Sequence, residues 1–271
     1  METVAPSLRD TLQNARKSRR ISQLELALRL GVSQRHVSFV ESGRSLPSRE
    51  LLLSWLNELQ APLALRNVAL LQAGYAPVYR ATTMSDDSLT PAREALSRLL
   101  AAHDPMPAMV MDAAWNVLQM NRGAQWLAHT LMPWAAQIPQ DQPFNMLDAM
   151  LHPEGMTHKM SNIEEVALVM LAHLRDDAAL VPALLPRVEL LAVQLQQRIG
   201  QHLAPHPSKM VARAMAPVLT TRFSTEHGEL SFFSMFTTFG TPQDITLSSL
   251  RVEHLFAADA ATREVFDAKV V

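Results

Sequence analysis

The chain has 271 residues, of which 48% are apolar and 18% charged, so it is a folded protein with room for two domains. It contains no cysteine, which excludes disulfides, cysteine-ligated zinc and thiol chemistry. The amino terminus lacks the apolar segment of a signal peptide, and the apolar runs are far shorter than the roughly 20 residues of a membrane span. We therefore expect a cytoplasmic protein with no membrane partner.

The formal net charge of −2 conceals an uneven distribution along the chain. Residues 1–80 contain eleven Lys and Arg against six Asp and Glu, whereas residues 81–271 contain thirteen against twenty. A basic first part followed by an acidic second part is typical of a protein in which only one domain contacts the phosphates of a nucleic acid.

The first 42 residues contain start signals for three helices and one tight turn. Ser7 and Ser22 each have an acidic residue three positions later, which is the capping-box pattern of a helix start. Gly31 ends the second helix, and only Val32 separates it from Ser33, the expected cap of the third. Two short helices joined so closely must cross steeply, which predicts a helix-turn-helix.

Two more helices are expected, one from Leu51 to Leu59 and one from Leu63 to Gln72, which makes five in all. The run ISQLELALRLGVSQRHVSFVESGRSLPS, followed by LLLSWLNEL, resembles the XRE/Cro family of DNA-binding domains over about residues 7–75. The resemblance implies that the helix from Ser33 to Ser42 lies in the major groove as the recognition helix.

Side-chain chemistry suggests how this helix reads DNA. Gln34 could pair with adenine and Arg35 with guanine, and Gln23 could hold a phosphate at the start of the second helix. Glu41 is expected to be paired inside the protein, because an acid near DNA repels phosphate. The predicted DNA-binding residues are Gln23, Ser33, Gln34, Arg35, His36 and Ser38, with Arg19, Arg20 and Arg44 as phosphate contacts.

Solvated surface charge explains Arg19, Arg20 and Arg44 almost equally well. The expected partner is double-stranded DNA with a pseudo-palindromic operator, because one recognition helix reads half a site and a homodimer reads both halves.

The region after residue 80 changes character. Residues 81–91 are predicted to be a linker, which leaves a first domain over 1–80 and a second over 92–271. The second domain is predicted to be α+β with one antiparallel sheet formed from both ends of the segment. Its expected elements are a helix from Thr90, a hairpin of Met109–Asp112 and Trp115–Met120, helices over 162–176 and 183–200, and strands over Val218–Thr225, Glu229–Phe239 and Leu247–Phe256.

The segments LSRLLAAHDPMPAMVMDAAWNVLQMNRGA and FNMLDAMLHP, with GELSFFSMFTTF near the end, resemble the MmyB-like ligand-binding domain. The resemblance implies a PAS-like domain that senses a small apolar, fatty-acid-like molecule. The sequence departs from the family at Ser224 and Thr225, where a His-Pro pair is usual, and near Ala214 and Met215, where a tryptophan is usual.

Adaptable methionines suit a pocket for apolar ligands, although methionines more often form ordinary core. The predicted ligand-binding residues are Met111, Trp115, Leu118, Trp126, Phe232 and Phe236. An alternative remains open in which the protein is a repressor or antitoxin-like regulator and the second domain only dimerises or docks a protein partner.

The sequence does not predict an enzyme. It contains no nucleophile motif, no phosphate-binding glycine loop and no HExxH, so we expect no catalytic residue, no cofactor and no metal. The nearest histidine pair is His202 and His206, and Pro205 between them disrupts the helical spacing that a metal pair needs.

Overall fold

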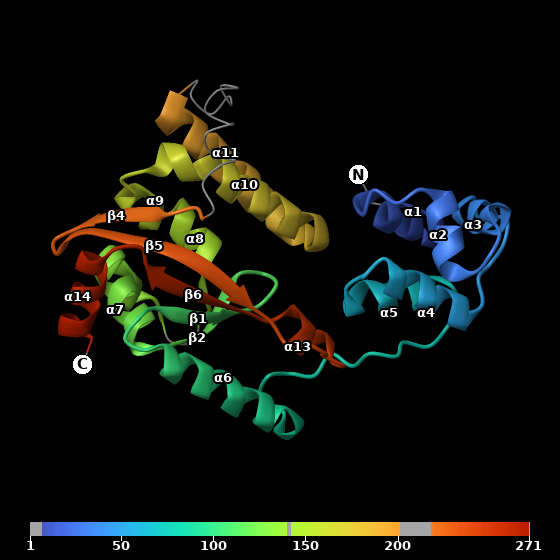
Figure 1. Ribbon diagram of the computed structural model, residues 1–271, viewed down its shortest axis with the longest axis horizontal. Helices are drawn as coiled ribbons and strands as arrows, with labels where there is room; N and C mark the ends of the chain where they lie inside the picture. Colours follow the sequence, from blue (N-terminus) through green and yellow to red (C-terminus); the bar gives the residue numbers. More distant parts are fainter. Residues whose placement is uncertain (1–6, 140–141, 201–217, 271) are drawn as a thin grey trace. The chain divides into compact units, whose positions relative to one another are not determined.

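The computed structural model describes residues 7–139, 142–200 and 218–270, which divide into two compact units (Figure 1). The first unit contains the chain up to residue 83 together with residues 241–248. The second contains residues 84–240 and 249–271. The first unit is therefore assembled from two separate parts of the sequence.

The described part of the first unit has the five predicted helices. Serine side chains cap three of them, as the sequence predicts for Ser22 and Ser33, with Ser48 as the third. Each serine oxygen accepts a hydrogen bond from a backbone amide in the first turn and so satisfies a group that the helix itself cannot. The helices are α1 (Leu8–Ser18), α2 (Gln23–Leu30), α3 (Gln34–Glu41), α4 (Arg49–Glu58) and α5 (Leu63–Gln72).

The core of these five helices centres on α4. Leu52, Trp55 and Leu56 are fully buried there, and Leu26 of α2 and Val37 of α3 are equally inaccessible. Burying a side chain of this size stabilises the fold by roughly 1.5–3 kcal/mol. The apolar spacing along each helix thus fixes which faces point inward, and it leaves the start of α3 on the surface.

Residues 241–248 attach to the chain that follows α5. Arg80 and Asp244 form a parallel β-bridge, and the Ile245 amide donates a hydrogen bond to the Arg80 carbonyl at 2.7 Å. The Asp244 carboxylate accepts another from the Thr82 amide at 3.1 Å. Residues 241–248 come between two strands of the second unit in the sequence. They are nevertheless hydrogen-bonded to the chain that ends the helical part of the first unit.

The second unit is built on a six-stranded antiparallel sheet with the order β3-β2-β1-β6-β5-β4. β1 pairs with β2 on one side and with β6 on the other, so segments from both ends of this unit share one sheet, as predicted. The strands are β1 (Ala108–Met111), β2 (Asn116–Met120), β3 (Phe144–Asn145), β4 (Thr221–Thr225), β5 (Gly228–Thr237) and β6 (Arg251–Ala257).

Helices cover both faces of the sheet (Figure 1). Leu96 and Leu100 of α6 are buried on the face that carries Val110 and Val252. The opposite face meets the remaining helices. The helices of the second unit are α6 (Thr90–His103), α7 (Arg122–Leu131), α8 (Met146–Leu151), α9 (Met156–Lys159), α10 (Ile163–Leu180), α11 (Leu185–Ile199) and α14 (Ala260–Lys269), with 3-10 turns at Asp87–Leu89, Pro133–Gln137 and Pro182–Leu184.

The predicted strand over Leu247–Phe256 was wrong at its beginning. Ile245–Ser249 form the short helix α13, and the strand starts only at Arg251. Asp244 accepts hydrogen bonds from the Thr246 and Leu247 amides, and this local capping outweighs the β preference of the residues that follow.

Candidate nucleic-acid interface and apolar cavity

The turn between α2 and α3 positions the surface predicted to meet DNA. Gly31 has φ 66° and ψ 28°, a left-handed conformation that a glycine adopts without steric cost. Ser33 then caps α3 by accepting a hydrogen bond from the His36 amide at 3.2 Å. Val37 and Val40 are buried, so the first turn of α3 points away from the core.

The predicted base-contacting residues lie at the cap and in the first two turns of α3. Those that are exposed or partly exposed are Ser33, Gln34, Arg35, His36 and Ser38. Two of the predicted arginines lie over the Phe39 ring, whose centroid is 5.1 Å from the guanidinium carbon of Arg35 and 5.8 Å from that of Arg44. A guanidinium over an aromatic face is held in orientation while its hydrogen-bond donors remain available.

Glu41 is buried and paired within the protein, as the sequence predicts. Arg16 donates from Nε and Nη2 to the two oxygens of Glu41, each at 2.7 Å, which is a bidentate ion pair. The hydrogen bond that Arg16 donates to the Glu41 carboxylate is the main cause that raises the pKa of Arg16. Gln23 donates to the same carboxylate at 2.8 Å, so its amide is fixed at the start of α2. The sequence did not identify Arg16 as the partner.

Arg19 and Arg20 are both exposed, but their local roles differ. Arg19 donates to the carbonyls of Leu59 at 2.9 Å and Gln60 at 3.1 Å, and so satisfies the carboxyl end of α4. Arg20 has a left-handed backbone with φ 56°. Their contact with phosphate stays a prediction, and Arg19 already has a structural role.

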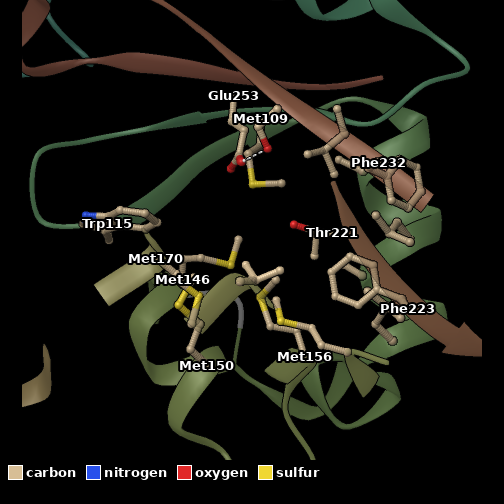
Figure 2. A pocket seen from close by; sticks show the side chains of 18 of the residues that line it. Met109, Trp115, Met146, Met150, Met156, Met170, Thr221, Phe223, Phe232 and Glu253 are labelled. Atoms are coloured by element: carbon tan, nitrogen blue, oxygen red, sulfur yellow. Dashed lines mark hydrogen bonds between the residues drawn. The ribbon is translucent and has the colours of Figure 1, made fainter. Parts of the chain in front are cut away.

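A cavity of about 320 Å³ lies between the sheet and the helices of the second unit (Figure 2). Its size is at the lower end of the range for small-molecule sites, and its wall is mostly apolar. Of the methionines that the structure describes, eight line it: Met109, Met120, Met132, Met146, Met150, Met156, Met160 and Met170. Aromatic rings complete the wall, namely Trp115, Phe144, Phe223, Phe232 and Phe236.

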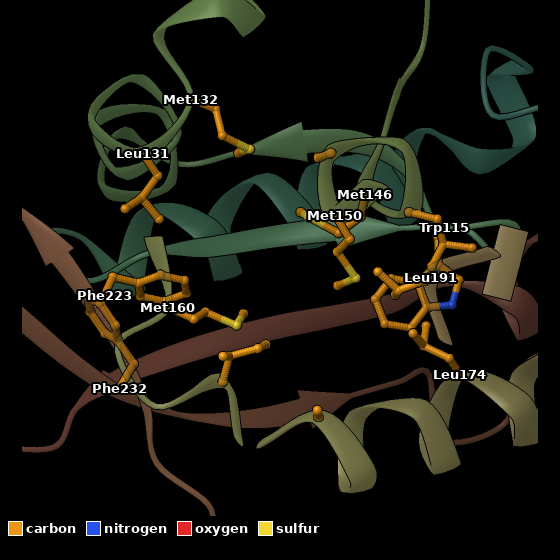
Figure 3. Packing of buried hydrophobic residues seen from close by; sticks show 14 of the residues in the cluster. Trp115, Leu131, Met132, Met146, Met150, Met160, Leu174, Leu191, Phe223 and Phe232 are labelled. Carbon is orange, nitrogen blue, oxygen red and sulfur yellow. The ribbon is translucent and has the colours of Figure 1, made fainter. Parts of the chain in front are cut away.

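Tightly packed side chains surround this space (Figure 3). Phe232 of β5 is fully buried, and its ring lies 6.2 Å from that of Phe223 on β4. Val169, Leu219 and Phe236 also line the cavity but keep 38–49% of their surface exposed, so the space is accessible from outside.

Four residues with polar side chains line the otherwise apolar wall: His173, Thr221, Ser234 and Glu253. Ser234 donates a hydrogen bond from Oγ to Glu253 Oε1 at 2.8 Å. Burial raises the pKa of Glu253, and the Ser234 hydrogen bond, Arg251 and His173 only partly oppose this effect. The neutral acid is thus favoured over a wider pH range than for a solvated glutamate.

Beside the cavity, Asp177 of α10 joins two side chains. Trp115 Nε1 donates to Asp177 Oδ2 at 2.9 Å, and Arg251 Nη1 donates to the same oxygen at 2.7 Å. The Arg251 guanidinium carbon also lies 4.1 Å from the Trp115 ring centroid. This cluster fixes Trp115, whose backbone has an unusual φ of 65°.

The structure brings three of the six predicted ligand-binding residues to the cavity: Trp115, Phe232 and Phe236. Met111 is fully buried in the core, and Leu118 is 40% exposed on β2. Trp126 stacks on His227 at 5.3 Å, outside the cavity wall.

Glu253 was not predicted from the sequence, although an acid in the middle of the predicted strand RVEHLFA was a usable signal. Ligand binding by all six predicted residues stays a prediction.

Among the described residues, no group of three or more His, Asp or Glu side chains could hold a metal ion. His202 and His206, and likewise Ala214 and Met215, lie outside the described residues. No described helix is long and apolar enough to cross a membrane.

Comparison with known proteins connects these two sites to families. A helix-turn-helix family model matches residues 12–65, and the model of the MmyB-like transcription regulator ligand binding domain matches residues 92–268. The comparison with curated proteins gave no match.

Among solved structures, an RNA-binding light-oxygen-voltage receptor is similar at 13% identity with a TM-score of 0.24, over 96% of this chain and 62% of that one. The chain thus spans less than two thirds of that receptor, and a TM-score this low supports no argument. The MmyB-like match covers more than half of the sequence. The chain therefore belongs to the family of transcription regulators with an MmyB-like ligand binding domain, and its helix-turn-helix makes it a DNA-binding regulator.

Proposed function

We propose that the protein reads a specific operator with α3 and changes its affinity for DNA when a small apolar molecule fills the cavity. The observation that supports base reading is the exposed first turn of α3, where Gln34 and Arg35 stand side by side. The expected complex is a homodimer on a pseudo-palindromic site, since each protomer supplies one recognition helix. We expect this complex to form in the cytoplasm. Both matched families are regulator domains, which supports a non-catalytic role.

Two arginines next to Phe39 provide a test of base reading. We expect Arg35→Ala to reduce discrimination at one base pair by roughly 1–3 kcal/mol, because a bidentate contact to guanine is lost. Arg44→Ala should weaken binding to all sequences alike and flatten its salt dependence. Fluorescence anisotropy with an operator and its single-base variants measures both. A uniform loss for Arg35→Ala would show that Arg35 contacts phosphate rather than a base.

The cavity is the observation that supports control by a ligand. Its methionines and aromatic rings suit a flexible, fatty-acid-like chain. Such a ligand shifts the DNA-binding equilibrium only if it prefers one of two states of the protein. Mass spectrometry of the full-length protein purified from its host should detect a co-purifying apolar molecule. Removing that molecule should change operator affinity, and adding it back should restore the original value.

The alternative function, a repressor or antitoxin-like regulator whose second unit only dimerises or docks a partner, has a specific observation in its favour. Leu190 and Val193 of α11 are each 51% exposed, and apolar side chains of this kind often pack against another protein. A cavity that stays empty, with no change in thermal stability across a panel of lipids and metabolites, would favour this alternative.

A further inference from the structure

The sulfur atoms of the protein are concentrated around the cavity. Because the chain has no cysteine, its 15 methionines carry all of its sulfur. Of the 12 methionines that the structure describes, eight line the cavity. Residues 2–83 and 241–248, which make up the first unit apart from Met1, contain neither methionine nor cysteine. A reagent that reacts with sulfur therefore modifies the second unit and leaves the surface of α3 chemically unchanged.

The thioether groups face one space from opposite sides. Figure 2 shows the side chains of Met109 on β1, Met156 on α9 and Met170 on α10 pointing toward the same part of the cavity. These elements belong to both layers of the second unit, since β1 is a strand of the sheet and the two helices cover it. A chemical change at these sulfurs thus acts where the helices pack on the sheet.

A small molecule from solvent can reach this space. Three of the eight lining methionines are only partly buried, namely Met120, Met156 and Met170, and Val169 beside the last of them is 49% exposed. The cavity of about 320 Å³ is roughly ten times the ~30 Å³ that one water molecule occupies in the liquid, so hydrogen peroxide fits inside. No thiol competes with these thioethers for an oxidant.

We propose that Met120, Met156 and Met170 are the sites of a reversible oxidation by hydrogen peroxide that changes the affinity of the protein for DNA. The thioether sulfur attacks one peroxide oxygen, the O–O bond breaks and an S–O bond forms. The departing hydroxide takes up the proton of the transferred oxygen and leaves as water. Sulfur loses two electrons to the peroxide, and the product is methionine sulfoxide. The inference goes beyond the proposed function, because it requires no bound ligand.

A sulfoxide changes the packing of the wall because its oxygen is a strong hydrogen-bond acceptor. Only four residues with polar side chains line the cavity, and one of them, Ser234, already donates to Glu253. An acceptor without a donor is costly in apolar surroundings. The oxidised wall therefore favours a state in which α9 and α10 loosen and the sulfoxides reach water. Such a shift changes operator affinity when the two states differ in their affinity for DNA.

The test treats the full-length protein with hydrogen peroxide and follows two quantities. Peptide mass spectrometry should place sulfoxides at Met120, Met156 and Met170 as well as at Met235, which is 53% exposed. Fluorescence anisotropy with a duplex selected from a random-sequence library should show a change in dissociation constant of about fivefold or more, the lower end of ordinary coupling between two sites. The two methionine sulfoxide reductases together should restore the original value, since each reduces one sulfoxide epimer.

Leucine variants separate the cavity methionines from those on the surface. Leucine replaces methionine at nearly equal volume and has no sulfur to oxidise. The combined variant Met120→Leu, Met156→Leu and Met170→Leu should lose the response to peroxide. Each protein is compared with its own untreated affinity, so a changed starting affinity does not alter the result. Met235→Leu is the matched control, because its side chain lies outside the cavity wall, and it should retain the full response.

Three results would overturn the proposal. The first is sulfoxide at all three positions with unchanged operator affinity. The second is a response that survives in the combined variant or disappears in Met235→Leu. The third is a loss of circular dichroism that the reductases do not reverse, which would make the oxidation damage rather than control. A protein that binds no selected duplex before treatment would contradict operator reading itself, and the inference would fall with it.

Discussion

Each unit of the molecule places a glutamate and an arginine in apolar surroundings, but it pairs them differently. In the helical unit, Arg16 and Glu41 satisfy each other in a bidentate ion pair. In the second unit, Arg251 and Glu253 are two residues apart on one strand and form no ion pair with each other. Glu253 is hydrogen-bonded to Ser234 instead, and Arg251 is paired with Asp177. The first arrangement is closed and structural. The second leaves hydrogen-bonding capacity beside a cavity, which is what a binding site needs.

The largest expected loss of stability comes from breaking the ion pair between Arg16 and Glu41. Glu41→Gln should lower the free energy of unfolding by roughly 3–5 kcal/mol, because it leaves the buried Arg16 charge without its counterion. Urea unfolding followed by circular dichroism measures the change. Glu25→Gln breaks the exposed pair with Arg29 and should cost only about 0.3–0.5 kcal/mol. A similar cost for both variants would mean that the buried pair is not a structural anchor.

Replacement of Asp177, which accepts hydrogen bonds from Trp115 and Arg251, is expected to reduce stability less. Asp177→Asn keeps an acceptor for Trp115 but removes the counterion of Arg251, and the Asp177 side chain is still 20% exposed. We expect a loss of about 1–3 kcal/mol in the free energy of unfolding, less than for Glu41. The fluorescence of Trp115 should also change if its ring is released, and an unchanged spectrum would contradict the anchoring role.

The smallest effect concerns the pH dependence of stability. Burial gives Glu253 a raised pKa in the folded protein, so the folded state holds this proton more tightly than the unfolded chain does. Stability from this group is complete below the unfolded pKa of about 4.3, and it declines as the pH rises from there through the folded pKa. Glu253→Gln should remove that decline. Unfolding curves measured across this range for both proteins test the sign, and parallel curves would contradict it.

The helical unit was predictable almost residue by residue, because its signals are local. Ser22, Gly31 and Ser33 define starts and ends through hydrogen bonds within a few residues, and the structure shows all three in those roles. The partner of Glu41 was not predictable in the same way. Arg16 is 25 positions away, and its place opposite Glu41 depends on how α1 packs on α3.

The sequence predicted that the second unit has an apolar pocket, but it predicted only some of the residues that line this pocket. Phe232 and Phe236, which are four residues apart on β5 and so share one face of the strand, were both predicted, and both line it. Leu118 and Trp126 do not line it, since the face that a short strand or helix presents depends on the layer that covers it. The methionines of α8 to α10 reach the cavity through helix packing, which no local pattern in the sequence specifies.

The attachment of residues 241–248 bears on how the protein can be divided for experiments. A fragment that stops at residue 83 would contain α1 to α5, but it would lose the Asp244 carboxylate that receives the Thr82 amide and the Ile245 amide that meets the Arg80 carbonyl. Such a truncation changes the end of the DNA-binding unit as well as removing the ligand domain. A difference in operator affinity between fragment and full chain would then combine both causes, whereas Asp244→Ala in the full chain separates them.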